Sequence, residues 1–171
     1  MTIIGDSVSA ALLAVPAAQT IVQRRYHVTY DLQVCRRLVD PSCEHDGVTP
    51  STALDEIRTL GRRLGRVVVI VVGYNDDPAR YRGGLDRVMR ALVRAHVRTV
   101  VWLTMRDPAG FYAPANKAIR VAPHRWHRLR VADWAALSRD HPDWVHSDGL
   151  HLYEAGALAM ARLIESRLPR P

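Results

Sequence analysis

Apolar runs alternate along this chain with segments whose apolar residues recur every three or four positions. The clearest run covers 66–72, where Val-Val-Val-Ile-Val-Val follows one arginine without a further polar residue. An unbroken apolar run of this length is typical of a parallel strand that is buried on both faces. We therefore expect 66–72 to form the central strand of a parallel sheet.

Four shorter runs predict the other strands. The first lies at the start of the chain, in Met-Thr-Ile-Ile-Gly-Asp-Ser, and the others cover 27–32, 97–104 and 129–133. After the first strand we expect Gly5 to let the backbone bend tightly, so that Ser7 opens the following helix at the edge of the sheet.

Helical spacing of apolar residues predicts the elements between these strands. A helix over 8–24 is expected to be kinked or broken at Pro16, and Thr49 followed by Pro50 predicts the start of a helix that ends before Gly65. The remaining predicted helices cover 78–95, 115–121 and 153–168, and 33–48 and 105–114 are predicted loops.

Strands that alternate with helices at this spacing predict an α/β fold, a three-layer α/β/α sandwich around a parallel five-stranded sheet. The 171 residues suit a single domain, 1–171. No segment reaches the roughly 18 apolar residues that cross a bilayer, and no signal peptide precedes the first strand. We expect a soluble chain with no membrane insertion, and the sequence carries no signal for an oligomeric state.

The formal net charge of +7 raises the question of a polyanionic partner. Lys117 is the only lysine, and the arginines are scattered over every predicted helical face. Because no helix-turn-helix, zinc-finger or ribonucleoprotein pattern accompanies the charge, we expect no nucleic-acid binding.

The two cysteines and a pair of histidines are the candidates for structural or metal chemistry. Cys35 and Cys43 flank a short loop with a proline, and they are either a disulfide in an oxidising compartment or two unrelated thiols. His124 and His127 have the spacing of metal ligands but lack acidic or thiol company, so an exposed amphipathic stretch is the expected alternative. We expect neither a metal nor another cofactor.

Polar residues with catalytic chemistry follow the predicted strands and precede the last helix. Ser7 follows the first strand, Asn75 follows the central strand, and Asp148 and His151 lie three residues apart in Ser-Asp-Gly-Leu-His. A serine nucleophile needs a base within hydrogen-bond reach and a group that orients the base. An amide donor aimed at the developing oxyanion completes such a set.

Each of these pieces is common by itself. Gly-Asp-Ser after a strand is an ordinary turn, Asn75 is a plausible helix cap, and His151 alone is a plausible surface histidine. Their joint occurrence, each at a predicted carboxyl edge, favours Ser7 as nucleophile, His151 as base and Asp148 as its partner.

Three blocks carry these residues: Gly-Asp-Ser at 5–7, Gly-Tyr-Asn-Asp at 73–76 and Ser-Asp-Gly-Leu-His-Leu at 147–152. In order and spacing they resemble the blocks of the SGNH, or GDSL-type, hydrolase family over nearly the whole chain. The resemblance implies a flavodoxin-like fold with Ser7, Asp148 and His151 as catalytic residues. It also implies an oxyanion hole made by Asn75, the Ser7 N–H and the N–H of Cys35, which is the counterpart of the family's glycine. The Asp31 to Arg36 pattern is similar to the SGNH domains attached to membrane acyltransferases that modify cell-surface sugars.

The predicted activity is that of a serine esterase on small acyl or acetyl esters, with a small molecule or a carbohydrate as the alcohol. Gly73 and Tyr74 are candidates to line the substrate site, and Arg36 and Arg106 either bind an anionic part of the substrate or form surface salt bridges. An O-acetyltransferase that passes the acyl group to a sugar, and an inactive carbohydrate-binding module, are the alternatives. The absent leader favours the cytoplasm, whereas the cysteine pair favours export of a longer chain, so the localisation stays open.

Overall fold

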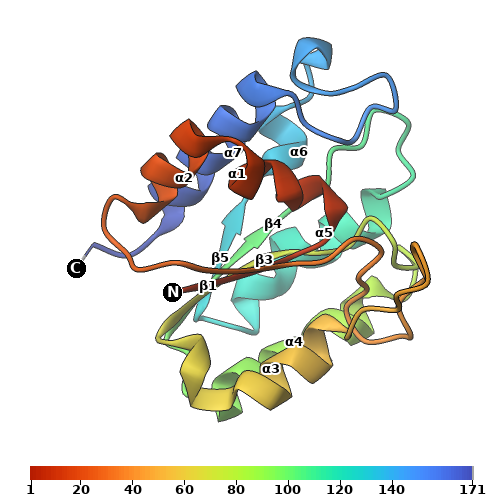
Figure 1. Cartoon of the computed structure of the whole chain (residues 1–171). Coiled ribbons are helices and arrows are strands. Elements are labelled where there is room, and N and C mark those ends of the chain that lie inside the picture. Colours follow the sequence, from red (N-terminus) through yellow and green to blue (C-terminus); the bar gives the residue numbers. More distant parts are fainter. Residues whose placement is uncertain (171) are drawn as a thin grey trace.

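The computed structural model describes residues 1–170 and contains one sheet of five parallel strands (Figure 1). Their order across the sheet is β2-β1-β3-β4-β5, which is flavodoxin-like and confirms the predicted fold class. The order reverses between β1 and β3, and in open α/β sheets ligands bind beyond the carboxyl ends at such a point. The strands are β1 (Thr2–Gly5), β2 (Thr29–Leu32), β3 (Val67–Val71), β4 (Thr99–Leu103) and β5 (Leu129–Ala132).

Helices cover both faces of the sheet and make three layers (Figure 1). One layer contains α1 (Ala11–Ala14), α2 (Pro16–Gln23), α6 (Trp134–Leu137) and α7 (Glu154–Arg167), and the other contains α3 (Ala53–Leu60), α4 (Tyr81–Arg94) and α5 (Ala113–Val121).

The strand side chains divide between two hydrophobic clusters, one under each helical layer. Ile3 and Val69 face the layer with α7, and Ile4 and Ile70 face the layer with α3 and α4. All four side chains are fully buried. Burial on both faces explains why the β3 run contains no polar residue.

Helix boundaries differ from the sequence expectation at two points. The helix predicted from Thr49–Pro50 begins at Ala53, because the Thr52 hydroxyl caps it by accepting from the N–H of Asp55 at 3.1 Å. The helix predicted over 8–24 is broken at Pro16, as expected, and its first turn is a 3₁₀ helix over Ser7–Ala10.

Gly5 corrects another expectation. It remains in β1, paired with Leu32 and Val71, and does not make the turn. A Cβ atom at this position would lie 1.9 Å from the hydroxyl oxygen of Ser9. The glycine is therefore needed because the first turn after β1 packs directly on the strand.

Candidate active site

Asp6 joins the ends of β1 and β3. Its carboxylate accepts from the N–H of Val8 at 3.1 Å and from the N–H groups of Gly73 and Tyr74 at 3.1 and 3.3 Å. The side chain is fully buried, and this burial raises the pKa of Asp6 to about 6 despite the three hydrogen bonds. The sequence pattern assigned Asp6 no role, although its place between Gly5 and Ser7 was the available signal.

Ser7 follows Asp6 at the first position of the 3₁₀ helix. The N–H groups of the first helical turn have no acceptor within the helix, so the N–H of Ser7 is not used by its own element. The Ser7 hydroxyl lies 3.1 Å from Nε2 of His151, which comes from the turn before α7. The structure thus brings together two residues that are 144 positions apart.

Asp148 holds the other side of the His151 ring. One carboxylate oxygen lies 2.6 Å from Nδ1 of His151, and the other accepts from the N–H groups of Leu150 and His151 at 2.8 and 3.0 Å. The hydrogen bond from the imidazole, supported by those backbone bonds, lowers the pKa of Asp148 to about 2. Gly149 makes this turn possible with a φ of +75°, a conformation that favours glycine. The carboxylate stays ionised and fixes the ring that faces Ser7.

Asn75 follows β3, next to the peptide groups that donate to Asp6. Its Nδ2 donates to the backbone oxygen of Arg36 at 3.2 Å. An amide nitrogen carries two hydrogens, so one N–H of Asn75 remains for another acceptor. The neighbouring Asp76 accepts from the N–H of Leu38, and burial raises the pKa of Asp76 to about 7. Both side chains therefore tie the end of β3 to the loop over 33–48.

Arg36, predicted either to bind a substrate anion or to form a surface salt bridge, is buried in an ion pair with Asp31. Its side chain is 1% exposed, and its guanidinium donates to both carboxylate oxygens of Asp31 at 2.9 and 3.0 Å and to the backbone oxygen of Ser51 at 3.0 Å. These bonds fix the position of Arg36 in the loop over 33–48, and the backbone oxygen of Arg36 accepts from Asn75.

The Arg106 side chain is also buried and also donates to acceptors within the protein. It is 5% exposed, and its Nη1 donates to the backbone oxygens of Ser138 and Arg139. Its N–H donates to the hydroxyl of Tyr74 at 2.7 Å. Both guanidinium groups donate to acceptors within the protein, and Arg106 also lines a hollow of about 150 Å³, so their substrate contacts stay predictions.

Gly73 and Tyr74 support the end of β3 and leave few groups for a substrate. Their N–H groups donate to Asp6, and the Tyr74 ring packs edge-on against Tyr112 at 5.2 Å between ring centroids. A Cβ atom on Gly73 would lie 2.6 Å from the sulfur of Met105. The hydroxyl of Tyr112, in the loop predicted over 105–114, donates to the Tyr74 oxygen at 3.2 Å.

The two cysteines form a disulfide, which decides between the two alternatives left by the sequence. Cys35 has a φ of +68°, in the left-handed region that favours glycine. The resemblance placed Cys35 where the family has a glycine, and the positive φ of Cys35 is a conformation that suits glycine.

A hollow of about 460 Å³ adjoins the site beside Asn75, between Arg37, Arg80 and Phe111. Within residues 1–170, no three His, Cys, Asp or Glu side chains are grouped so that they could hold a metal ion. None of the helices in that part of the chain is both long and apolar enough to span a membrane.

Comparison with known proteins gives the fold a family context, although no family model matches the chain. The O-acetyltransferase OatA of Staphylococcus aureus is 26% identical over 162 residues, which is 95% of this chain but 24% of that protein. The chain thus spans about a quarter of the length of this relative.

Two solved structures cover almost the whole chain. One from Slackia heliotrinireducens, assigned to the SGNH hydrolases, has a TM-score of 0.71 at 16% identity and covers 98% of this chain and 97% of its own. A carbohydrate esterase family 3 structure from Talaromyces cellulolyticus has a TM-score of 0.62 at 16% identity, covering 96% of this chain and 93% of its own. The chain has the fold of SGNH hydrolases.

Proposed function

We propose that this chain is a serine esterase that acts on small acyl or acetyl esters, with a carbohydrate as the preferred alcohol. The observation that carries this proposal is the line of hydrogen bonds from Ser7 through His151 to Asp148, at 3.1 and 2.6 Å. A hydroxyl beside an oriented imidazole is the arrangement that nucleophilic acyl transfer requires. The fold of a carbohydrate esterase and the sequence similarity to an O-acetyltransferase support the choice of substrate class.

In the first half-reaction the Ser7 oxygen attacks the ester carbonyl while Nε2 of His151 takes its proton. Asp148 stabilises the imidazolium without itself becoming protonated. The free N–H of Asn75, the N–H of Ser7 and the N–H of Cys35 are the proposed donors to the oxyanion. Collapse of the tetrahedral intermediate returns the proton to the leaving alcohol and leaves an acyl-serine.

In the second half-reaction water attacks the acyl-serine and gives its proton to His151. As the bond between the acyl carbon and the Ser7 oxygen breaks, His151 returns this proton to Ser7 and the carboxylic acid leaves. The side chains of His151 and Asp148 are 47% and 45% exposed, so water reaches the acyl group readily. This exposure favours hydrolysis over transfer.

An O-acetyltransferase is the second candidate, because the similarity to OatA covers 95% of this chain. Here the hydroxyl of a sugar replaces water in the second half-reaction. Analysis of products from an acetyl donor with a sugar acceptor present separates the two, since transfer yields an acetylated sugar and hydrolysis yields acetate.

The test is hydrolysis of p-nitrophenyl acetate together with labelling by a fluorophosphonate probe. Ser7→Ala is expected to lower kcat by about 10³-fold or more and to abolish labelling. Ser166→Ala, a change of an exposed serine on α7, is the matched control and is expected to behave like the parent. Equal hydrolysis by the Ser7 variant would refute the proposal, and a parent chain that neither hydrolyses nor labels would be the inactive binding module.

A further inference from the structure

Three hollows follow one another from the candidate active site along α4. The first, of about 460 Å³, is lined by Asn75 and Arg80. The second, of about 390 Å³, shares Arg80 with the first and continues to Arg87 and Arg90. The third, of about 320 Å³, shares Arg87 and Arg90 with the second and lies between α3 and α4. Neighbouring hollows share lining residues and follow one face of α4, and we call this row of hollows the α4 trough.

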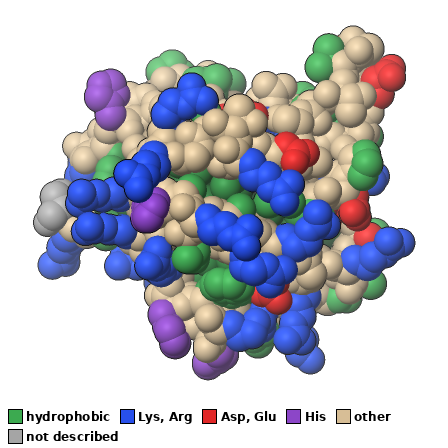
Figure 2. Space-filling view, turned by 90° about the horizontal axis from the view of Figure 1, so that it is seen from below, with side chains coloured by type: hydrophobic (Ala, Val, Ile, Leu, Met, Phe, Trp, Pro, Cys, Tyr) green, Lys and Arg blue, Asp and Glu red, His purple; other side chains and the backbone are tan. Residues whose placement is uncertain are grey.

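Arginine side chains line all three hollows, and Asp40, Asp76 and Asp77 also line the first, at the active-site end. Figure 2 looks onto this side of the molecule and shows Lys and Arg side chains crowded around a patch of hydrophobic ones. Arg80 and Arg94 are fourteen residues apart, which is about 21 Å along a helix. The lining arginines are Arg37, Arg58, Arg80, Arg87, Arg90 and Arg94.

Much of this charge is not neutralised by the protein. Arg80 pairs with Asp77 at 3.0 Å and Arg58 with Asp55 at 3.5 Å. Over the described range 1–170, Arg87, Arg90 and Arg94 form no ion pair with a carboxylate. Asp40 lines the first and second hollows, and the residues that line the third include no acid. The middle and far parts of the trough therefore carry a net positive charge.

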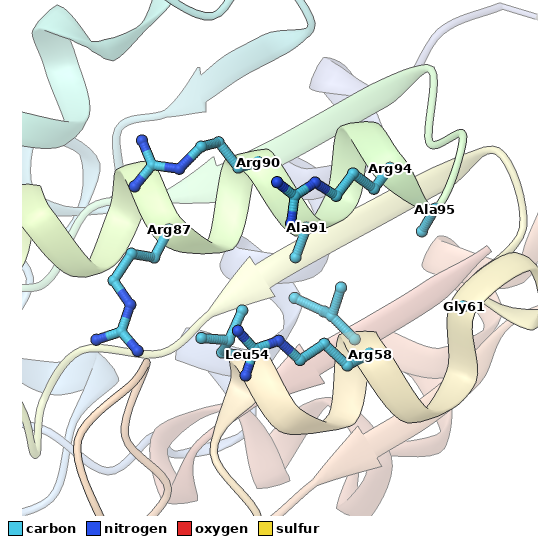
Figure 3. A pocket seen from close by; sticks show the side chains of 9 residues that line it. Leu54, Arg58, Gly61, Arg87, Arg90, Ala91, Arg94 and Ala95 are labelled. Carbon is cyan, nitrogen blue, oxygen red and sulfur yellow. The ribbon is translucent and has the colours of Figure 1, made fainter.

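The floor of the trough consists of small or already buried side chains. Gly84 lines the second hollow. Ala91 and Ala95 of α4 line the third, together with the buried Leu54 of α3 (Figure 3). Phe111 is the one aromatic side chain that lines any of the three hollows, and it lies at the active-site end. Single-stranded nucleic acids stack on repeated aromatic side chains, and membrane-bound surfaces insert large apolar ones, neither of which this floor offers.

We infer that the α4 trough binds a linear glycan that carries carboxylate or phosphate groups along its length, and that it leads this chain to Ser7. Guanidinium groups bind such anions in a bidentate fashion, and a row of them suits a ligand with repeated charges. A neutral, narrow floor suits sugar rings between those charges. The inference rests on the proposed function for the acyl-transfer step and names its substrate as an acylated anionic polysaccharide.

Binding is measured with the Ser7→Ala variant, which removes turnover, by fluorescence anisotropy of a labelled decamer of polygalacturonate and of a phosphorylated dextran of similar length. Neutral dextran, a single-stranded oligonucleotide and phosphatidylglycerol vesicles are the comparison ligands. We expect the charged glycans to bind, neutral dextran to bind weakly, and the two charged glycans to show whether carboxylate or phosphate is preferred. Tighter binding of the oligonucleotide or the vesicles than of both glycans would overturn the inference.

The decisive variant is Arg87→Gln with Arg90→Gln, which removes two exposed charges shared by neighbouring hollows. We expect it to weaken glycan binding about tenfold and to reduce its salt dependence. The matched control is Arg162→Gln with Arg167→Gln, two exposed arginines of α7 on the opposite side of the sheet, and it is expected to bind like the parent. Equal affinities of the trough variant and this control variant would refute the inference.

Activity then separates this inference from the proposed function. In the Ser7-containing protein, the Arg87 and Arg90 changes are expected to leave p-nitrophenyl acetate hydrolysis unchanged and to raise KM for acetylated polygalacturonate about tenfold. No hydrolysis of either ester by the parent would contradict the esterase proposal. The binding results would still show whether the α4 trough binds an anionic glycan. An unchanged KM for the polymer would contradict the trough as a route for substrate.

Discussion

Asp148 contacts His151 twice, through Nδ1 of the ring at 2.6 Å and through the backbone N–H at 3.0 Å. The carboxylate therefore fixes both the position of the residue and the ring nitrogen that carries the proton. Asp148→Asn keeps the size of the side chain but offers an N–H where the ring needs an acceptor. We expect kcat for p-nitrophenyl acetate to fall about 10³-fold with little change in KM.

Asp143→Asn is the control for this change, because Asp143 is exposed and lies beside a different histidine, His141. It is expected to keep the parent kcat. If Asp148→Asn retained full kcat, a role for the carboxylate in orienting the base would be excluded.

The two asparagines of the chain provide a second test. Asn75 makes one side-chain hydrogen bond, to the Arg36 oxygen, whereas Asn116 is buried and exchanges two bonds of 2.8 Å with the backbone of Met105. We expect Asn75→Ala to lower kcat by about 10²-fold to 10³-fold, since it removes a proposed oxyanion donor. Asn116→Ala is expected to reduce the free energy of unfolding by about 2 kcal/mol instead. Kinetics and urea unfolding of both variants check this contrast, and an Asn75 variant that lost only stability would contradict it.

Gly5 and Gly83 differ in what a Cβ atom would meet. At Gly5 it would lie 1.9 Å from Ser9 Oγ, and at Gly83, inside α4, it meets no atom within 4 Å. We expect Gly5→Ala to reduce the free energy of unfolding by about 1–3 kcal/mol and to shift Ser7. Gly83→Ala is expected to raise it by up to about 1 kcal/mol, because alanine favours a helix. Chemical denaturation measures the free energy of unfolding of both variants. A Gly5 variant as stable as the parent would show that the 3₁₀ helix over Ser7–Ala10 can shift to make room for a Cβ atom at little cost.

The sequence predicted those features that depend on local pattern. The β3 run is apolar because both its faces are buried. Ser7 comes after β1, Asn75 after β3, and His151 before α7. Their convergence follows from a parallel sheet, whose carboxyl ends share one edge.

Features that depend on tertiary contacts were beyond the sequence. Spacing alone does not show whether Arg36 faces solvent or Asp31, and this is decided by how the loop over 33–48 folds against β2. The four-residue α6 is too short for a helical period to appear. The third hollow of the α4 trough requires α3 and α4 to pack side by side, which spacing along the chain does not show.

The disulfide holds Cys35 at a φ of +68°, at a proposed oxyanion donor. Cys43→Ser opens a loop closed over a sequence separation of eight, and we expect it to cost about 2 kcal/mol of stability and to lower kcat. The parent treated with dithiothreitol should show the same fall in kcat, and the variant should not respond to the reductant. Full kcat in the reduced parent would show that the loop holds its conformation without the bond.

Replacing Cys35 in the Cys43→Ser background tests the backbone itself. Glycine adopts a positive φ freely, whereas alanine pays about 1 kcal/mol there. We expect Cys35→Gly to be the more stable and more active of the two double variants. Thermal unfolding and kcat measure both variants. A more stable and more active Cys35→Ala variant would show that the positive φ at this position matters neither for stability nor for activity.

Burial raises the pKa of Asp76 to about 7, above its ordinary value of 3.8. The folded chain then binds this proton more tightly than the unfolded chain, so the contribution of Asp76 to stability is present at low pH and is lost as the pH rises from near 3.8 to about 7. Asp76→Asn removes the titration but keeps a carbonyl oxygen for the N–H of Leu38. We therefore expect the Tm of the variant to fall less than that of the parent between pH 4 and pH 7. Asp77→Asn, which changes the exposed neighbouring residue, should follow the parent in calorimetry at each pH, and identical slopes for the parent and Asp76→Asn would show that this carboxyl is solvated in solution.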